Sequence, residues 1–396
     1  MNYIIFDDAT RENLKPLTYT RPICEIRVGI MTIREKWEKY LESKTSTLTE
    51  DYLREKYPIE LSDSMILING SICPTAHIVK KIKALKPNQT LIDGETIIAM
   101  YKTKDGFLAD DGEVSERIEA ETSDYICIAN PWDIFTNNER AIKEDYALIT
   151  KGRKSVKLSD TNKVICPENV FVEEGAVVEC ATLNAKDGVI YIGKNAEIME
   201  NSVIRGTFAM CEYSILKLGT KIYGATTLGP YSKIGGELAN VVIFGYSNKA
   251  HDGFIGNSVI GEWCNIGADT NASNLKNTYE EVRLWSISQN TFVSTGQTFC
   301  GTIMADHSKC GINTMLNTGT IVGVNANIFG HGYQRNFIPS FVWGGSSGLK
   351  IYDFNKAIEV AKRMYARRNL VFSEVEERIL KAVFDLTLRN KRLKPV

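Results

Sequence analysis

An aliphatic residue returns at every sixth position through much of the C-terminal half of this 396-residue chain. Residues 218–236, LGTKIYGATTLGPYSKIGG, show the period clearly, because small and turn-forming residues separate the apolar ones. An amphipathic helix repeats every 3.6 residues and a half-buried strand every second residue, so neither explains a period of six. The positions in this register are Ile165, Phe171, Val177 and Leu183, then Ile192, Ile198, Ile204, Met210, Leu216, Ile222, Leu228 and Ile234, and later Met304, Cys310, Leu316, Val322 and Ile328.

Such a repeat predicts a solenoid of short strands, each of which points one apolar side chain inward. Gly, Asn, Ser and Asp fill the corners because they tolerate tight or left-handed backbone. Three hexads close one triangular coil of about 18 residues, and the coils stack through parallel hydrogen bonds. The pattern is typical of the hexapeptide-repeat parallel β-helix, whose left-handed coiling we take from that class and not from the spacing. A scaffold of this kind need not be an enzyme, so we expect function where the repeat breaks, between residues 237 and 300.

The break contains a motif of defined spacing, SNKAHDGFIGNSVIGEWCNIGADTNASNL, over residues 247–275. His251 is followed by Gly256, then by the pattern I-G-x-x-x-N-x-G-A-x-T over residues 260–270, and then by Asn274. This stretch resembles the acetyltransferase domain of the bifunctional uridylyltransferase/acetyltransferase family that makes UDP-N-acetylglucosamine, and that family's archaeal sugar-phosphate relatives.

The resemblance implies a role for each matching residue. It makes His251 the general base that takes a proton from a sugar amine, which then attacks the thioester of acetyl-CoA, a task that suits an imidazole near pH 7. It places Asn274 at the acetyl group and the sugar, Asn265 at the sugar, and positions near Ala305 and Val324 beside the pantetheine arm. Members of this family work as homotrimers with sites between subunits, which predicts the same here. The alternative, that His251 is only a hydrogen-bonded corner residue, stays open.

The sequence departs from the family at the substrate phosphate. The family tyrosine three residues after the base is Phe254, and the phosphate-binding Arg and Lys of the family fall at Gly229 and Ala239. The flexible side chain of a lysine can bring its ammonium group to a phosphate from several backbone positions. The lysines that could take this role are Lys233, Lys249 and Lys276.

Residues 1–150 show a different pattern, in which strands and helices alternate. YIIFDD, SMILING and DYICIAN read as strands, and VGIMTIREKWEKYL has a helical apolar face, which together predict a Rossmann-like α/β sheet. The opening FDDATRENLKPLTYTRP resembles the start of sugar nucleotidyltransferases, G-G-x-G-T-R-x-x-P-L-T-x-x-x-P-K. By that resemblance Arg11, Lys15 and Arg21 are the candidate phosphate-binding residues.

The glycines of that motif are replaced by Asp7, Asp8 and Ala9. Two carboxylates at this place would repel a triphosphate unless Mg²⁺ bridges them. The metal-binding Asp of the family falls at Asn69 or Ser71. Catalysis of nucleotidyl transfer is therefore slightly less favoured than two other roles for this domain: binding of a sugar nucleotide, or a domain that has lost its activity. The candidate metal ligands are Asp7, Asp8 and Asp133.

The domain boundaries follow from these patterns. We predict a nucleotidyltransferase-like domain over 1–150, a polar linker over 151–163, the β-helix over 164–332, and a C-terminal helical cap over 333–396. Lys plus Arg number 47 and Asp plus Glu 48, which gives no electrostatic case for nucleic acid or an anionic membrane. Without a spanning apolar run or a signal peptide, and with nine scattered cysteines, the chain reads as cytoplasmic.

Together these features predict an N-acetyltransferase that uses acetyl-CoA and acts on a sugar phosphate or nucleotide-sugar, fused to a divergent nucleotidyltransferase domain. One alternative is an active Mg²⁺-dependent nucleotidyltransferase, and another is a non-catalytic sugar-nucleotide binding scaffold. A zinc hydratase is disfavoured because the four histidines form no close pair in the sequence. These are His77, His251, His307 and His331.

Overall fold

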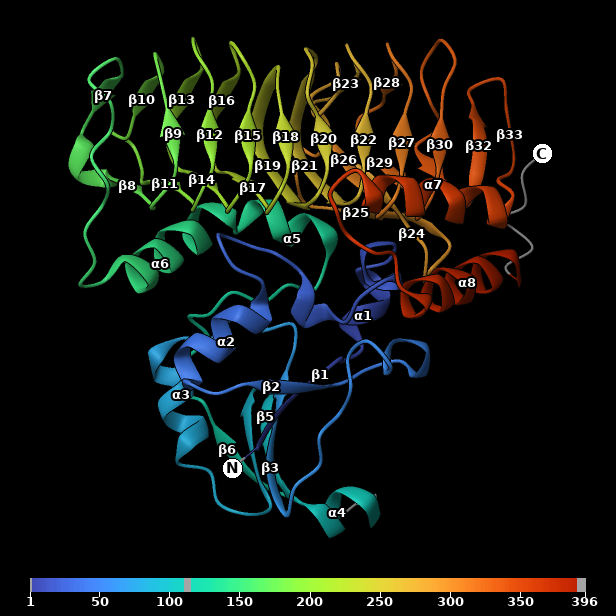
Figure 1. Cartoon of the computed structure of the whole chain (residues 1–396). Coiled ribbons are helices and arrows are strands. Elements are labelled where there is room, and N and C mark those ends of the chain that lie inside the picture. Colours follow the sequence, from blue (N-terminus) through green and yellow to red (C-terminus); the bar gives the residue numbers. More distant parts are fainter. Residues whose placement is uncertain (1, 110–114, 390–396) are drawn as a thin grey trace. The chain divides into compact units, whose positions relative to one another are not determined.

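The computed structural model describes residues 2–109 and 115–389, which fall into two compact units (Figure 1). The first unit comprises Met1–Leu14, Thr20–Ile26 and Met31–Asn130. The second comprises Lys15–Tyr19, Arg27–Ile30 and Pro131–Val396, and so includes the solenoid and the C-terminal helices. No helix in the described ranges has the length and apolar character needed to cross a membrane.

The first unit is built on a six-stranded mixed sheet with the order β2-β1-β3-β5-β4-β6. Strand β1 runs parallel to its neighbours β2 and β3, and β5 runs antiparallel to both of its neighbours. The strands are β1 (Asn2–Phe6), β2 (Thr45–Leu48), β3 (Ser64–Asn69), β4 (Gln89–Asp93), β5 (Thr96–Thr103) and β6 (Glu116–Glu119). This sheet confirms the predicted α/β class. DYICIAN is not a strand, because it forms only an isolated bridge between Ile72 and Cys127.

Helices surround this sheet: α1 (Thr10–Asn13), α2 (Ile33–Leu41), α3 (Ala76–Lys83) and α4 (Lys104–Ala109). The helix predicted from VGIMTIREKWEKYL is α2, which begins with a capping box between Thr32 and Glu35. Its Trp37 is fully buried and donates its indole N–H to the carbonyl of Ile72 at 2.8 Å. Short 3-10 helices lie at Leu17–Tyr19, Ile23–Glu25, Asp51–Leu53 and Pro167–Asn169.

The second unit is a parallel β-solenoid with three faces, as the hexads predicted (Figure 1). The first face contains β7 (Lys163–Ile165), β10 (Thr182–Asn184), β13 (Val203–Arg205), β16 (Lys221–Tyr223), the beginnings of β19 (Glu237–Gly245) and β21 (Phe254–Glu262), β23 (Asn271–Ala272) and β28 (Met315–Leu316). The second contains β8 (Val170–Val172), β11 (Ile190–Ile192), β14 (Phe208–Met210), β17 (Thr226–Leu228), the ends of β19 and β21, β26 (Thr302–Met304), β29 (Thr320–Val322) and β31 (Phe337–Ile338).

The third face contains the strands that concern the candidate site. These are β9 (Val177–Val178), β12 (Glu197–Ile198), β15 (Ile215–Leu216), β18 (Lys233–Ile234), β20 (Asn248–Lys249), β22 (Asn265–Ile266), β27 (Lys309–Cys310), β30 (Asn327–Ile328) and β32 (Val342–Gly345). The hairpin strand β33 (Gly348–Ile351) pairs antiparallel with β32 and ends the sheet.

The inward positions confirm the predicted register from Leu183 onward, because every hexad residue from there is buried. The first three positions were wrong. The inward residues there are Val164, Val172 and Val178, not Ile165, Phe171 and Val177. The 3-10 turn before β8 lengthens this coil and shifts its register, so Val177 is 52% exposed and Phe171 packs outward.

The predicted break begins later in the chain than residue 237. Strands β19 and β21 each turn a corner within nine residues, so the coils continue with shortened spacing. The coils are interrupted after β23, by a segment that leaves the solenoid before β26. This segment carries the antiparallel hairpin of β24 (Arg283–Ser286) and β25 (Thr291–Ser294). The motif around His251 is therefore part of an intact coil.

Helices pack on the outside of the solenoid (Figure 1). On the second face, α5 (Pro131–Thr136) is followed by α6 (Asn138–Thr150), whose Ile142 packs in one apolar cluster with Phe171 and Tyr191. The C-terminal helices are α7 (Phe354–Ala366) and α8 (Glu374–Arg389). Helix α7 runs back along the coils, from Phe341 near its start to Trp263 near its end.

One corner of the solenoid carries an aromatic ladder, which we define as Tyr213, Tyr231, Tyr246, Trp263 and His307. All five residues have φ between 52° and 62°, the left-handed corner conformation. Their rings stack with centroid separations of 4.8, 5.1, 4.5 and 6.4 Å along the series. Tyr365 of α7 stacks on Trp263 at 3.8 Å, which fixes the end of this helix against the coils.

Candidate active site

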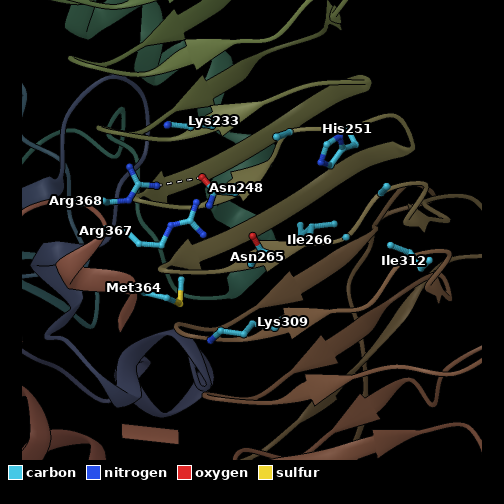
Figure 2. A pocket seen from close by; sticks show the side chains of 13 residues that line it. Lys233, Asn248, His251, Asn265, Ile266, Lys309, Ile312, Met364, Arg367 and Arg368 are labelled. Carbon is cyan, nitrogen blue, oxygen red and sulfur yellow. Dashed lines mark hydrogen bonds between the residues drawn. The ribbon is translucent and has the colours of Figure 1, made fainter. Parts of the chain in front are cut away.

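A cavity of about 580 Å³ lies on the third face of the solenoid, beside the end of α7 (Figure 2). Both sides of the cavity belong to the second unit. It is lined by Lys233, Asn248, Ala250, His251, Asn265, Ile266, Gly267, Ala268, Lys309, Ile312, Met364, Arg367 and Arg368. This lining includes four cationic side chains and, among the described residues, no carboxylate. Such a cavity favours an anionic ligand.

His251 lies at the corner that follows β20 and lines the cavity. The side chain is exposed, and within the described ranges its ring makes no hydrogen bond. A ring nitrogen without a protein partner is free to accept a proton from a ligand. Asn265 lines the same cavity and can supply an amide to a polar ligand. The motif has thus brought these two predicted residues together.

Three of the cations are available to a ligand. Lys233 and Arg367 are exposed, and neither forms an ion pair with any described carboxylate. Lys309 is half-buried and donates one hydrogen bond to the carbonyl of His307 at 2.7 Å, which leaves two N–H groups. Burial lowers the pKa of Lys309 to about 8.

The fourth cation, Arg368, is committed to holding α7 on the solenoid. Its guanidinium donates to the carbonyls of Tyr231 at 2.6 Å and Tyr246 at 3.0 Å. It also donates to Oδ1 of Asn248 at 3.1 Å (Figure 2). It also lies over the rings of Tyr246 and Trp263. These contacts place Arg367 at the edge of the cavity.

The predicted phosphate-binding Lys249 does not line the cavity. It is only 1% exposed, because its side chain points into the solenoid core. Its ammonium group donates to the carbonyl of His251 and, at 3.0 Å, to that of Asp252. Lys249 therefore cannot bind a phosphate here.

Three other predicted residues lie around the corner, away from the cavity. Asn274 donates from Nδ2 to Oδ1 of Asn257 at 2.8 Å. Phe254 begins β21 on the first face, and Lys276 donates to the carbonyl of Glu281 at 2.7 Å. None of these three side chains contributes to the cavity lining within this chain.

The positions predicted beside the coenzyme are buried, and one of the two family cation positions, Gly229, has no room for a side chain. Ala305 and Val324 are fully buried, so their side chains face no groove. A Cβ atom on Gly229 would lie 1.9 Å from the carbonyl oxygen of Phe244, so no side chain fits there. Of the lysines that the sequence offered for the phosphate, Lys233 lines the cavity, and it is joined there by Lys309 on β27 and by Arg367 after α7.

The predicted metal ligands of the first unit are already occupied. Asp7 accepts from Arg11 at 2.8 Å, from the backbone N–H of Ile23 at 2.7 Å, and from the hydroxyl of Thr49. Burial raises the pKa of Asp7, although Arg11 and the hydrogen bonds oppose that shift. The buried Asp7–Arg11 pair leaves neither group free for a ligand.

Asp8 is held in the same way, by the backbone N–H of Thr10 at 3.0 Å and by Nδ2 of Asn69 at 2.9 Å. Asp133 belongs to the second unit. In the described part of the chain, no group of three or more His, Cys, Asp or Glu side chains is arranged to hold a metal ion. These residues do not fit Mg²⁺.

The phosphate-binding roles predicted for the basic residues of this region are not supported either. Arg11 is 4% exposed and Arg21 is also buried. Lys15 belongs to the second unit, where its Nζ lies 5.5 Å from the centre of the Tyr19 ring. The cavity of about 360 Å³ beside Arg11 is lined by two arginines, Arg11 and Arg54, but by five carboxylates, namely Asp7, Asp8, Glu12, Glu50 and Asp51. A triphosphate would be repelled there.

We therefore expect Mg²⁺ to leave the thermal stability of the full chain unchanged. A bound ion would stabilise the folded state in proportion to the logarithm of its concentration. Thermal unfolding without and with millimolar Mg²⁺ measures this, with an equal concentration of Ca²⁺ as the control for non-specific ionic effects. A midpoint that rises with Mg²⁺ alone would contradict the occupied state of Asp7 and Asp8.

Comparisons with known proteins address both parts of the chain. Residues 3–154 match the family model described as sugar nucleotidyl transferase. A bifunctional sugar-1-phosphate nucleotidylyltransferase/acetyltransferase of Sulfurisphaera tokodaii is 29% identical over 189 residues, which cover 42% of this chain and 47% of that protein. The bifunctional protein GlmU of Methanocaldococcus jannaschii is 24% identical over 259 residues, which cover 63% of this chain and 49% of that protein.

A third relative, the bifunctional protein GlmU of Methanococcus vannielii, is 29% identical over 205 residues, which cover 51% of this chain and 42% of that protein. The chain spans about half the length of the curated relatives it matches. The resemblance seen in the sequence is thereby confirmed: residues 3–154 match the sugar nucleotidyl transferase family, and the chain is similar to bifunctional sugar-1-phosphate nucleotidylyltransferase/acetyltransferases.

Proposed function

We propose that this chain transfers an acetyl group from acetyl-CoA to the amine of a sugar phosphate or nucleotide-sugar, with His251 as the general base. The observation that carries the proposal is a single cavity that holds a histidine with a free ring and three available cations. The names of the curated relatives support the same kind of reaction. All nine cysteines are free thiols, which supports a cytoplasmic setting.

Each part of the cavity has a chemical task in this reaction. Acetyl-CoA supplies the activated acetyl group. His251 takes the proton that the amine loses when its nitrogen attacks the thioester carbon. The C–S bond then breaks, and the thiolate takes that proton from the imidazolium and leaves as coenzyme A. Lys233, Lys309 and Arg367 hold the phosphate of a ligand, and Asn265 donates to its sugar hydroxyls or accepts from them.

We further propose that the enzyme is a homotrimer. Exposed apolar side chains on the solenoid, such as Ile312 at 70% and Leu218 at 66% exposure, support burial against other copies of the chain. In such an assembly the corner with His251 faces a neighbouring copy. Asn274 and Phe254, on the other side of that corner, then approach a ligand held by the neighbouring cavity.

The direct test is an assay of the full chain with acetyl-CoA and a panel of amino-sugar phosphates, each paired with its unphosphorylated amino sugar. We expect release of coenzyme A and formation of an acetamido sugar, with the phosphorylated acceptors strongly preferred. If no member of the panel is acetylated while acetyl-CoA binds, the proposed reaction is wrong.

The phosphate role of the cations gives a sharper prediction. Arg367→Ala should raise KM for the phosphorylated acceptor about 10-fold or more, since a hydrogen bond to a charged group contributes roughly 1.5–3 kcal/mol. Arg363→Ala is the matched control, because Arg363 is exposed in the last turn of α7, just before Arg367, and pairs with Glu359 at 3.0 Å. An equal rise in the two variants, or none in either, would contradict the assignment. A rise in KM for acetyl-CoA instead would assign the cations to the phosphates of the donor.

The pH dependence of the same affinity tests Lys309. Its lowered pKa means that the ammonium loses its charge as the pH rises through about 8, so phosphate binding should weaken above that pH. The charged and polar groups around it are the thiol of Cys264 and the carbonyl of His307. Lys309→Met should bind more weakly at pH 7 and lose this pH dependence.

A second candidate function is nucleotidyl transfer by the first unit, which the family match of residues 3–154 favours. The buried Asp7–Arg11 pair opposes it. The assay is release of pyrophosphate from a nucleoside triphosphate in the presence of a sugar 1-phosphate and Mg²⁺. We expect no release of pyrophosphate. Clear release would assign nucleotidyl transfer to the first unit.

A further inference from the structure

One charged side chain interrupts the apolar core of the solenoid beside the candidate site. In the third face, Lys249 of β20 pairs with Ile234 of β18, and the next strand places Ile266 at the corresponding position. Ile234 and Ile266 are both buried core residues. Lys249 is as buried as they are, with 1% of its surface exposed. A lysine at such a position costs free energy unless its ammonium group is satisfied.

The ammonium group of Lys249 is satisfied by the corner that presents His251. It donates to the carbonyl oxygens of His251 and Asp252, two consecutive residues of the turn between β20 and β21. The carboxylates that favour its charge are Asp252 in that turn and Asp269 after β22, and burial opposes them and lowers the pKa of Lys249 to about 8. The side chain thus ties the turn to the solenoid core from the inside.

We propose that Lys249 is a positioning residue, which fixes the His251 corner against the core so that the imidazole stays aimed at the cavity. This inference rests on the proposed general-base role of His251. A turn without this tether samples other positions, and a misplacement of about 1 Å in a reacting group can lower the rate 10²-fold. The phosphate-binding cations lie on other elements, so substrate binding is unaffected.

A purely structural role for Lys249 predicts a different outcome. If the lysine only stabilised the fold, its replacement would lower stability together with activity. If it is retained for positioning, an apolar replacement of similar length removes a buried charge from the core, and the fold gains or keeps stability while the rate falls.

The experiment compares K249M with the control I234M, which alters the neighbouring inward position on β18 but leaves the ammonium group of Lys249 in place. For K249M we expect kcat to fall roughly 10- to 100-fold, KM to stay within about twofold, and the melting temperature to stay level or rise. I234M should keep both kcat and KM. A K249M chain that unfolds, or loses melting temperature in step with activity, would overturn the proposal.

Hydrogen exchange provides a readout that does not depend on catalysis. In K249M the backbone amides of residues 250–253 should exchange faster than in the wild-type chain, whereas in I234M they should not. Unchanged exchange at this turn would overturn the tether. If the wild-type chain shows no acetyl transfer but the exchange result holds, the proposed function has failed and the tether has not.

Discussion

His251→Gln is expected to lower kcat by about 10²- to 10⁴-fold, the range that a general base contributes. Glutamine keeps a polar side chain at the corner but cannot take a proton from the amine. Because the proposed phosphate contacts come from Lys233, Lys309 and Arg367, which line the same cavity, KM should change little. Steady-state acetyl transfer with the preferred amino-sugar phosphate, measured for wild type and variant in parallel, gives both values.

The control for this prediction is His331→Gln, since His331 is an exposed histidine after β30 that does not line the cavity. Its kcat should equal that of the wild type. A His251→Gln chain that keeps more than about half of the wild-type kcat would show that the imidazole is only a corner residue, the alternative that the sequence left open.

The second large effect is expected for Trp263→Ala. Trp263 is buried in the aromatic ladder, stacked 4.5 Å from Tyr246 and 3.8 Å from Tyr365 of α7. Loss of a buried tryptophan costs about 3–5 kcal/mol, and the stacking with Tyr365 is lost as well. We expect a lower melting temperature and faster hydrogen exchange in α7. Since α7 positions Arg367, KM for the phosphorylated acceptor should rise.

Tyr213→Ala is the matched control, because Tyr213 stands at the other end of the same ladder and is 44% exposed. It should cost little stability and leave α7 protected. If Trp263→Ala leaves the exchange of α7 and KM unchanged, the helix is held by other contacts and the ladder does not organise the cavity.

Much of the solenoid could be predicted from the sequence because a period of six is a local property. Each counted inward position from Leu183 onward could be identified from the apolar residues six positions before and after it. The period failed where a 3-10 turn lengthened the first coil and displaced Val172 and Val178 from the counted positions. It also failed to place Lys249 in the core, because a lysine at a hexad position reads as a break in the pattern.

The site was predicted only in part, for a physical reason. His251 and Asn265 lie within one motif, so their proximity follows from local coil geometry. Lys309 and Arg367 come from segments far away in the sequence. Arg367 is held at the cavity by contacts of α7 and Arg368 with the coils, among them the stacking of Tyr365 on Trp263. These residues lie about a hundred positions or more apart, and no local pattern relates them.

Contacts between distant residues also explain why the metal site predicted in the first unit is not formed. Asp7 and Asp8 read as a metal pair because they are adjacent in the sequence. In the fold, Asp7 is neutralised by Arg11 and Asp8 is bound by Asn69, a residue of β3. Their hydrogen-bond partners, and not their spacing, decide what these carboxylates can bind.

A crystal structure of the full chain with coenzyme A and the preferred acceptor tests the central claim most directly. We predict that the thiol of the coenzyme and the amine of the acceptor meet beside the ring of His251, with a ligand phosphate against Lys309 and Arg367. Ligands bound at a place remote from His251, with this cavity filled only by solvent, would contradict the account.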